Sequence, residues 1–219
     1  RYGSSAASDV YKRQNYLCVF LIQECSNINM GLKILIIGSG GREHAISWII
    51  SKSKRDIEKI FVMPGNAGTL SEKNVFNIEC DINDHEAVLN FALENKIDLT
   101  IVGPEVPLVK GISDLFEEKN LNIFGPKQYF AQLEGSKVFS KNFMASNNLP
   151  TAKYKEFNDS KKAKEYLDDK KMPIVIKYDG LAAGKGVDIC ETIDDAKKSV
   201  DNLLKPNERI IIEDFIKGI

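Results

Sequence analysis

One glycine-rich loop carries the clearest chemical signal in the chain. The apolar run 173–176 predicts a strand that delivers Lys177 to the start of this loop. The loop itself holds three glycines and a second lysine, namely Gly180, Gly184, Lys185 and Gly186. Glycines let such a loop close over a polyphosphate and present backbone amides, while lysines neutralise the phosphate charge. The loop is not of the Walker A type, because Gly186 stands where that motif needs Ser or Thr. The competing interpretation is a flexible β-hairpin with incidental lysines.

A second glycine cluster, Gly38–His44, follows an apolar run at 32–37 and precedes a helical pattern. A strand-to-helix turn of this kind turns backbone N–H groups and the helix dipole toward an anion. The cluster resembles G-x-G-x-x-G, but Glu43 takes the place of the third glycine. The acidic residue expected at the end of the next strand, 59–63, is also missing. A dinucleotide is therefore disfavoured, which leaves a smaller phosphorylated ligand or a tight structural turn.

Other candidate residues are ambiguous when each is taken alone. The loops Pro64–Gly68 and Gly103–Glu105 leave the carboxyl ends of predicted strands, which is the edge where open α/β sheets bind ligands. Glycine and proline are also ordinary turn residues. Lys137 is equally typical of a solvated helix, and the two acids in Glu213–Ile216 are common at a strand end.

The first predicted domain covers residues 30–127, where short apolar runs alternate with helical patterns. The expected strands are 32–37, 59–63, 99–102 and 122–124, and the expected helices are 42–52, 84–95 and 108–118. Asp84 is a candidate helix cap. Alternation of this kind predicts a doubly wound α/β domain with a parallel sheet covered on both faces.

The second predicted domain covers residues 128–219. We expect helices at 136–147, 160–169 and 194–204, and strands at 153–157, 173–178, 187–190 and 209–214. The first of these helices is expected to bury Val138, Phe139, Phe143 and Met144. The pattern predicts a small α+β lobe. Because the sequence stops at Ile219 directly after a strand, we expect this domain to be truncated.

The bulk composition excludes several classes of function. Thirty basic and 31 acidic residues give a net charge of −1, so there is no basic excess for a nucleic-acid partner. The four cysteines show no C-x-x-C spacing, which disfavours zinc and a disulfide framework and predicts a cytoplasmic setting. The apolar run 16–22 is too short to span a membrane, so no membrane partner is expected. Residues 1–29 are interpreted as a non-native or disordered leader, with a targeting segment as the alternative.

These segments, in this order, resemble the N-terminal portion of the phosphoribosylamine–glycine ligase (glycinamide ribonucleotide synthetase) family, part of the ATP-grasp superfamily. The similarity runs from Met30 to Gly218, and its most specific stretch is Gly-Leu-Ala-Ala-Gly-Lys-Gly-Val at 180–187. Tyr178 is a departure, because the family usually has a small residue there. The resemblance implies a pre-ATP-grasp domain followed by the first lobe of an ATP-grasp domain.

The resemblance also implies two sets of site residues. The ATP-binding set comprises Lys137, Lys177, Asp179, Gly180, Gly184, Lys185, Gly186, Glu213, Asp214, Phe215 and Ile216. Within this set, Lys177 and Lys185 are the implied catalytic residues, and Glu213–Ile216 is the implied adenine hinge. The set for the amine substrate comprises Gly40, Gly41, Arg42, Glu43, His44, Asn66, Gly103, Pro104 and Glu105.

The activity implied by the resemblance is ligation of glycine to 5-phosphoribosylamine through glycyl phosphate, with ATP and Mg²⁺ or Mn²⁺, in purine synthesis. The metal ligands are expected beyond Ile219 and none within this chain, so the isolated chain is not expected to turn over. The expected partners are the two small-molecule substrates, and the full-length form is expected to be a monomer.

The sequence leaves three alternative functions open. One alternative is a different ATP-grasp ligase or carboxylase, but the Gly-Arg-Glu-His and Pro-Gly-Asn-Ala-Gly segments favour the glycine ligase. An NAD-dependent oxidoreductase and a non-enzymatic binding module are the remaining alternatives.

Overall fold

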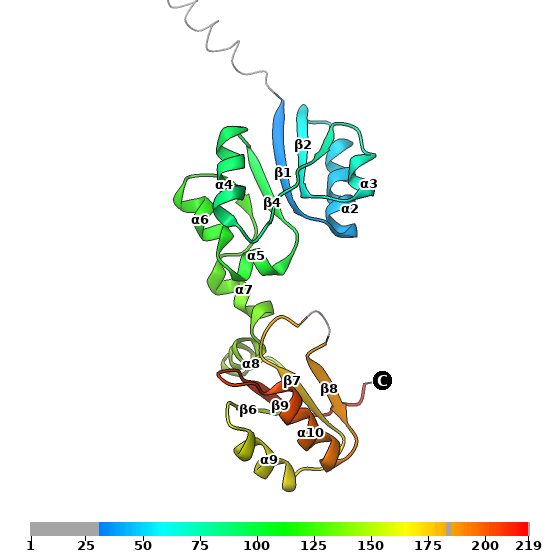
Figure 1. Ribbon diagram of the computed structural model, residues 1–219, viewed down its shortest axis with the longest axis vertical. Coiled ribbons are helices and arrows are strands. Elements are labelled where there is room, and N and C mark those ends of the chain that lie inside the picture. Colours follow the sequence, from blue (N-terminus) through cyan, green and yellow to red (C-terminus); the bar gives the residue numbers. More distant parts are fainter. Residues whose placement is uncertain (1–30, 183–184, 219) are drawn as a thin grey trace, which may run out of the picture. The chain divides into compact units, whose positions relative to one another are not determined.

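The computed structural model describes residues 31–182 and 185–218, which form two compact units (Figure 1). The first unit ends at Gly103 and the second begins at Pro104. The interpretations of residues 1–29 and of Gly184 fall outside the described residues.

The first unit is built on a parallel sheet with strand order β3-β2-β1-β4. Its strands are β1 (Leu32–Gly38), β2 (Ile57–Pro64), β3 (Val75–Asn77) and β4 (Leu99–Val102), and its helices are α2 (Gly41–Ser51), α3 (Ala67–Leu70) and α4 (His85–Glu94). Ile36 on β1 pairs with Val62 on β2 and with Ile101 on β4.

Both faces of this sheet are covered by helices. On one face, Ile34, Ile36 and Val62 pack with Ile46 of α2. On the other face, Phe61 meets Phe91 of α4 edge to face, with ring centroids 5.3 Å apart. Strands buried on both sides read as continuous apolar runs rather than alternating ones. The predicted doubly wound α/β fold is confirmed.

Helix α3 and strand β3 were not predicted, because both are short. Pro64, Gly65 and Gly68 made the region read as a turn. In the structure Asn66 caps α3: its side chain accepts from the Thr69 amide at 3.0 Å, and the Thr69 hydroxyl accepts from the Asn66 amide at 2.8 Å. The Asn-x-x-Thr spacing is a capping signal that the sequence does contain.

The second unit begins with a run of helices and one short strand. They are α5 (Glu105–Val109), α6 (Ile112–Glu118), β5 (Ile123–Phe124), α7 (Gln128–Gly135) and α8 (Lys137–Ser146). The prediction of one helix over 108–118 was wrong. Gly111 takes a left-handed conformation with φ of +89°, which ends one helical segment and begins the next.

An antiparallel sheet completes the second unit, with strand order β6-β9-β7-β8. Its strands are β6 (Tyr154–Phe157), β7 (Ile174–Tyr178), β8 (Val187–Cys190) and β9 (Ile210–Asp214), accompanied by helices α9 (Ser160–Asp168) and α10 (Ile193–Leu203). All four strands and both helices were predicted to within three residues at each end. The predicted α+β lobe is confirmed.

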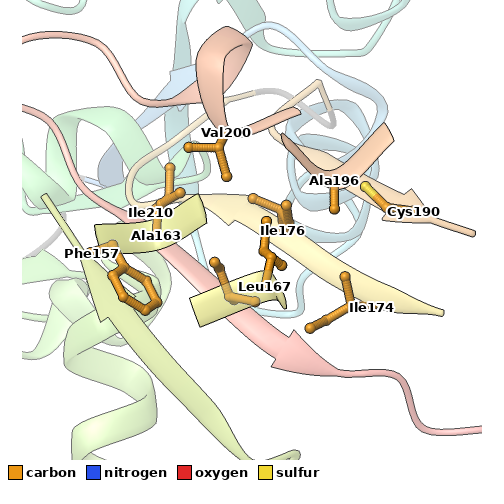
Figure 2. Close-up of a cluster of buried hydrophobic side chains, with 10 residues drawn as sticks. Phe157, Ala163, Leu167, Ile174, Ile176, Cys190, Ala196, Val200 and Ile210 are labelled. Carbon is orange, nitrogen blue, oxygen red and sulfur yellow. The ribbon is translucent and has the colours of Figure 1, made fainter. Parts of the chain in front are cut away.

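Helices α9 and α10 cover one face of the antiparallel sheet, where they form its core (Figure 2). Leu167 of α9 and Val200 of α10 meet Ile174 and Ile176 of β7 there, and all four are at most 1% exposed. Because side chains alternate along a strand, Lys177 and Glu213 point to the opposite face. The polar residues of interest therefore lie on the face away from the core.

Helix α8 buries only part of the face that was predicted. Val138 is buried as expected and Phe139 and Met144 are half-buried, but Phe143 is 42% exposed and Lys141 is only 7% exposed. The prediction for Phe143 was wrong, because the helix turns Lys141 rather than Phe143 toward the interior. Among the described residues, no helix is both long and apolar enough to cross a membrane.

Replacing Leu167 by alanine tests the core of the second unit. We expect a loss of about 2–5 kcal/mol in the free energy of unfolding, because the side chain is fully buried and leaves a cavity. Urea denaturation measures this loss. The matched control is Leu149→Ala, since Leu149 is 47% exposed and should lose less than about 1 kcal/mol. Equal losses in the two variants would contradict the described packing.

Candidate functional site

Three lysines converge on one cavity of the second unit. Lys137 and Lys141 lie one turn apart on α8 and so share a helix face, and Lys177 comes from β7. The cavity has a volume of about 330 Å³. Its lining residues are Leu133, Glu134, Lys137, Ser140, Lys141, Met144, Lys177 and Glu213. The three lysines outnumber the two carboxylates of the lining, Glu134 and Glu213, and the remaining positive charge favours an anionic ligand.

Glu213 is the acceptor at the centre of this cluster. Its Oε2 atom lies 3.0 Å from the Lys177 ammonium and 3.1 Å from the Lys141 ammonium. The residue is 4% exposed. Its second oxygen, Oε1, is buried and has no hydrogen-bond partner among the described residues. A buried carboxylate needs such neutralisation, and the free oxygen leaves one acceptor without a donor.

The position of Glu213 follows from strand register. Val175 of β7 stands opposite Glu213 of β9, and Lys177 stands opposite Ile211. Lys177 and Glu213 are therefore diagonal neighbours on one face, within reach of long side chains. The same face exposes Val187 and Ile189 of β8, at 44% and 59%. It thus combines charged and apolar surface.

Lys141 was missed by the sequence analysis. Its ammonium donates to the Thr151 hydroxyl at 2.6 Å and to the Ala152 carbonyl at 3.5 Å, as well as contacting Glu213. It also lies 5.6 Å from the centre of the Tyr154 ring. The available signal was the four-residue spacing from Lys137, which places both lysines on one helix face.

Lys137 faces the glycine loop rather than Glu213. Its ammonium donates to the Gly180 carbonyl at 2.8 Å. Burial lowers the pKa of this lysine, Lys177 adds to the lowering, and Asp179 opposes it. Lys137 and Lys177 thus line the same cavity, whereas Lys185 is exposed and does not line it.

Asp179 ties the glycine loop to the start of α8. Its Oδ1 accepts from the Ser136 hydroxyl at 2.9 Å and from the Val138 amide at 3.1 Å. Its Oδ2 lies 2.7 Å from the Arg209 guanidinium, and its side chain is 4% exposed. All these bonds are internal to the protein. A role of Asp179 in nucleotide binding stays a prediction.

Tyr178 packs beneath the glycine loop. A Cβ at Gly180 would lie 2.7 Å from the Tyr178 ring, and Gly180 has φ of +153°. The Tyr178 amide donates to the Gly186 carbonyl at 2.8 Å, and its hydroxyl donates to Glu208 at 3.3 Å. Burial, reinforced by Glu208, raises the pKa of the phenol. Tyr178 therefore makes the loop dependent on glycine at position 180.

The predicted hinge leaves the end of β9. Asp214 is the last residue of the strand, and its amide donates to the Lys153 carbonyl at 2.9 Å. Phe215 and Ile216 follow without regular structure and are 40% and 65% exposed. Neither of them lines the lysine cavity.

The first unit brings the other glycine cluster together around Glu43. This carboxylate is 3% exposed, and its Oε2 accepts from the Gly40 amide at 2.6 Å. Gly38 and Gly103 approach it so closely that a Cβ at either position would collide with its side chain. Glu43 therefore fills the crevice between the ends of β1 and β4, which argues against a dinucleotide there.

The remaining substrate-site residues of the first unit surround this loop. Asn66 donates to the carbonyls of Ser39 and Gly40 at 2.9 and 3.2 Å. His44 lies 3.0 Å from Glu72. Space is open where a Cβ at Gly41 would project, and the side chain of Arg42 is 71% exposed.

Pro104 and Glu105 belong to the second unit, where they cap and begin α5. Their role in binding the amine substrate stays a prediction.

Comparison with known proteins places this geometry in a class. In fold, the chain resembles the ADP-bound structure of an N5-carboxyaminoimidazole ribonucleotide synthetase, with a TM-score of 0.67 at 19% identity over 85% of this chain and 47% of that one. Residues 135–219 match the family model described as phosphoribosylglycinamide synthetase, ATP-grasp (A) domain. Residues 135–219 are therefore part of an ATP-grasp domain.

The family follows from the rest of the chain. Residues 32–134 match the model described as phosphoribosylglycinamide synthetase, N domain. The chain belongs to the phosphoribosylglycinamide synthetase family, and the resemblance read from its motifs is confirmed.

Named relatives agree with this assignment. The phosphoribosylamine–glycine ligase of Escherichia coli O157:H7 is 49% identical over 193 residues, covering 85% of this chain and 45% of that protein. The Pseudomonas putida ligase is also 49% identical and is covered to 44%. The crystal structure of the Thermotoga maritima ligase has a TM-score of 0.66 at 28% identity, covering 86% of this chain and 45% of that one. The chain thus spans less than half the length of these relatives.

The anchoring of Asp179 can be tested by replacing it with alanine. We expect the free energy of unfolding to fall by about 2 kcal/mol, because a buried acceptor of several hydrogen bonds is lost. Chemical denaturation measures the change. The matched control is Asp169→Ala on the exposed end of α9, which should change stability by less than about 0.5 kcal/mol. A neutral Asp179 variant would contradict the described network.

Proposed function

We propose that this chain supplies the phosphate-binding lobe and the amine-substrate domain of an ATP-dependent ligase joining glycine to 5-phosphoribosylamine. The observation that carries the proposal is the lysine cavity, where Lys137 and Lys177 flank the glycine loop of an ATP-grasp domain. The names of the relatives support the choice of substrates.

The proposed reaction has two steps. A carboxylate oxygen of glycine attacks the γ-phosphorus of ATP, the bond to the β,γ-bridging oxygen breaks, and ADP leaves. The amine nitrogen of phosphoribosylamine then attacks the acyl carbon of glycyl phosphate. The carbon–oxygen bond to phosphate breaks, the nitrogen loses a proton, and the amide and phosphate are released.

In this proposal the lysines act by charge rather than as acids or bases. The first step brings two anions together, and their repulsion is reduced by ammonium groups held in place beforehand. Lys137 and Lys177 already face the cavity. Lys185 would join them when its loop closes over the phosphates, together with the amides of Gly180, Gly184 and Gly186.

The purine end of ATP is proposed to meet the strand end that carries the predicted hinge, residues 213–216. The unpartnered Oε1 of Glu213 supports this proposal, because it can accept from an amino group. Val187 and Ile189 expose apolar side chains on the same sheet face. They would suit the flat faces of a base.

The amine substrate is proposed to contact the first unit at Gly40–His44, Asn66 and Gly103. The open space at Gly41 and the exposed Arg42 support placing the sugar phosphate there. The buried charge of Glu43 disfavours a phosphate deeper in the crevice.

Mg²⁺ or Mn²⁺ is proposed to accompany ATP, as in other phosphoryl transfers. The described residues contain no group of three or more His, Cys, Asp or Glu side chains placed to hold a metal ion. These residues do not by themselves make a metal site, and the steps above use none.

We also propose that the full protein is a cytoplasmic monomer that acts in purine synthesis. The boundary between the two domains of this chain is proposed at residue 127. The free thiols of Cys80 and Cys190 support a reducing compartment.

A chimera tests the activity. Residues 31–218 would replace the aligned part of the Escherichia coli ligase, and ATP- and glycine-dependent amide formation would be assayed. We expect activity, and we expect Lys177→Met to lower kcat by about a hundredfold or more, because it removes charge stabilisation from the phosphoryl transfer. The matched control is Lys161→Met, an exposed lysine on α9. A folded chimera without activity would refute the proposal.

The pH dependence of ATP binding tests the role of Lys137. Burial lowers the pKa of its ammonium, so the positive charge is lost at a lower pH than for an ordinary lysine. We expect ATP affinity, measured by calorimetry from about pH 7 to about pH 10, to fall as Lys137 deprotonates. Lys137→Arg should remove most of this fall, because the guanidinium stays charged. Parallel curves for the two proteins would exclude Lys137 as the cause.

A further inference from the structure

Lys141 has no assigned role, yet it is the most deeply buried of the three cavity lysines. Its side chain is 9% exposed, compared with 27% for Lys177. An ammonium has three N–H donors. Lys141 donates to Thr151 Oγ1 and to the Ala152 carbonyl, and its ammonium forms an ion pair with Glu213 Oε2. Three oxygen atoms of the protein therefore surround the Lys141 ammonium.

Lys177 differs from Lys141 in this respect. Among the described residues, its ammonium has one hydrogen-bond partner, the same Oε2 of Glu213. Two of its donors are available at the cavity that it lines. The two lysines and Glu213 together carry a charge of +1, so one lysine is in excess of what the carboxylate needs.

We propose that Lys141 is a positioning residue that keeps Glu213 neutralised, so that Lys177 can turn to the phosphate of a ligand. The inference rests on the proposed function, since it takes Lys177 as a phosphate-binding residue. If Lys177 left a carboxylate that had no other cation, a buried charge would be unpaired, which is strongly unfavourable. With Lys141 in place, the carboxylate keeps its partner throughout.

Removal of the charge on Lys141 should weaken phosphate binding at Lys177. Glu213 would then retain Lys177, and phosphate binding would have to compete with that ion pair. Removing the charge of Glu213 as well would release Lys177 again. A residue that only supports the fold would show no such rescue.

Inorganic tripolyphosphate is the appropriate probe, because it has no base and so reports on the phosphate site alone. We expect Lys141→Gln to weaken its binding to the 219-residue chain about tenfold or more in calorimetry, since one buried counter-charge is lost. The double variant Lys141→Gln/Glu213→Gln should return to within about threefold of the unmodified chain. Lys161→Gln, on the helix-covered side, is the matched control.

A second measurement does not depend on a ligand. Trace acetylation followed by mass spectrometry reports how freely the Lys177 amine reacts. Lys141→Gln should slow the acetylation of Lys177, because Glu213 then holds that ammonium alone, and the double variant should restore the rate. Circular dichroism checks that each variant is folded. Lys141→Met serves in place of Lys141→Gln if the latter does not fold.

The outcomes separate this inference from the proposed function. Weak binding by Lys141→Gln with rescue in the double variant supports the inference. Unchanged binding in Lys141→Gln, or equal weakness in the single and double variants, overturns it and leaves the proposed phosphate site intact. Failure of the unmodified chain to bind tripolyphosphate overturns both.

Discussion

The second unit depends on one buried carboxylate that is shared by two lysines. Glu213 lies in the middle of the antiparallel sheet, on the face opposite the core, and is almost fully enclosed. A charge at such a position is tolerated only with partners, and those partners come from β7 and α8. The interaction therefore fixes helix α8 against the sheet as well as arranging the lysines around the cavity.

A second hydrogen-bond and ion-pair network holds the first turn of the same helix. Asp179, directly after β7, accepts from the first turn of α8 and pairs with Arg209, next to the start of β9. The glycine loop is thus anchored on one side by Asp179 and contacted by Lys137 at Gly180. These contacts hold the start of the glycine loop against helix α8.

Sequence reasoning predicted the parts of this architecture that have a local cause. The strand before Lys177 and the glycines after it are consecutive in the chain, and hydrophobic periodicity located nearly all the longer elements. It failed where the cause lies elsewhere. The break at Gly111 and the exposure of Phe143 depend on neighbouring elements that no local pattern names.

The importance of Lys141 was hidden for the same reason. Its partners Thr151 and Glu213 lie 10 and 72 residues away in the sequence, so its burial follows from the folded arrangement. A lysine in a helix is assigned to the surface by default, because lysines are rarely buried. Only the folded structure shows that the Glu213 carboxylate lies beside the Lys141 ammonium.

The first unit also encloses a carboxylate beside a glycine cluster, and the contrast with Glu213 explains why the two clusters suit different ligands. Glu43 accepts from a backbone amide, and its ion pair is with the largely exposed Arg42 at 4.0 Å, so the described contacts place no buried cation against it. Its side chain occupies the crevice that a dinucleotide phosphate would need, and its negative charge would repel that phosphate. Glu213 is over-neutralised by lysines, which leaves positive charge beside it for an anion. The same residue type therefore excludes phosphate from one crevice and helps to organise a phosphate site in the other, and the difference is set by the partners that the fold supplies.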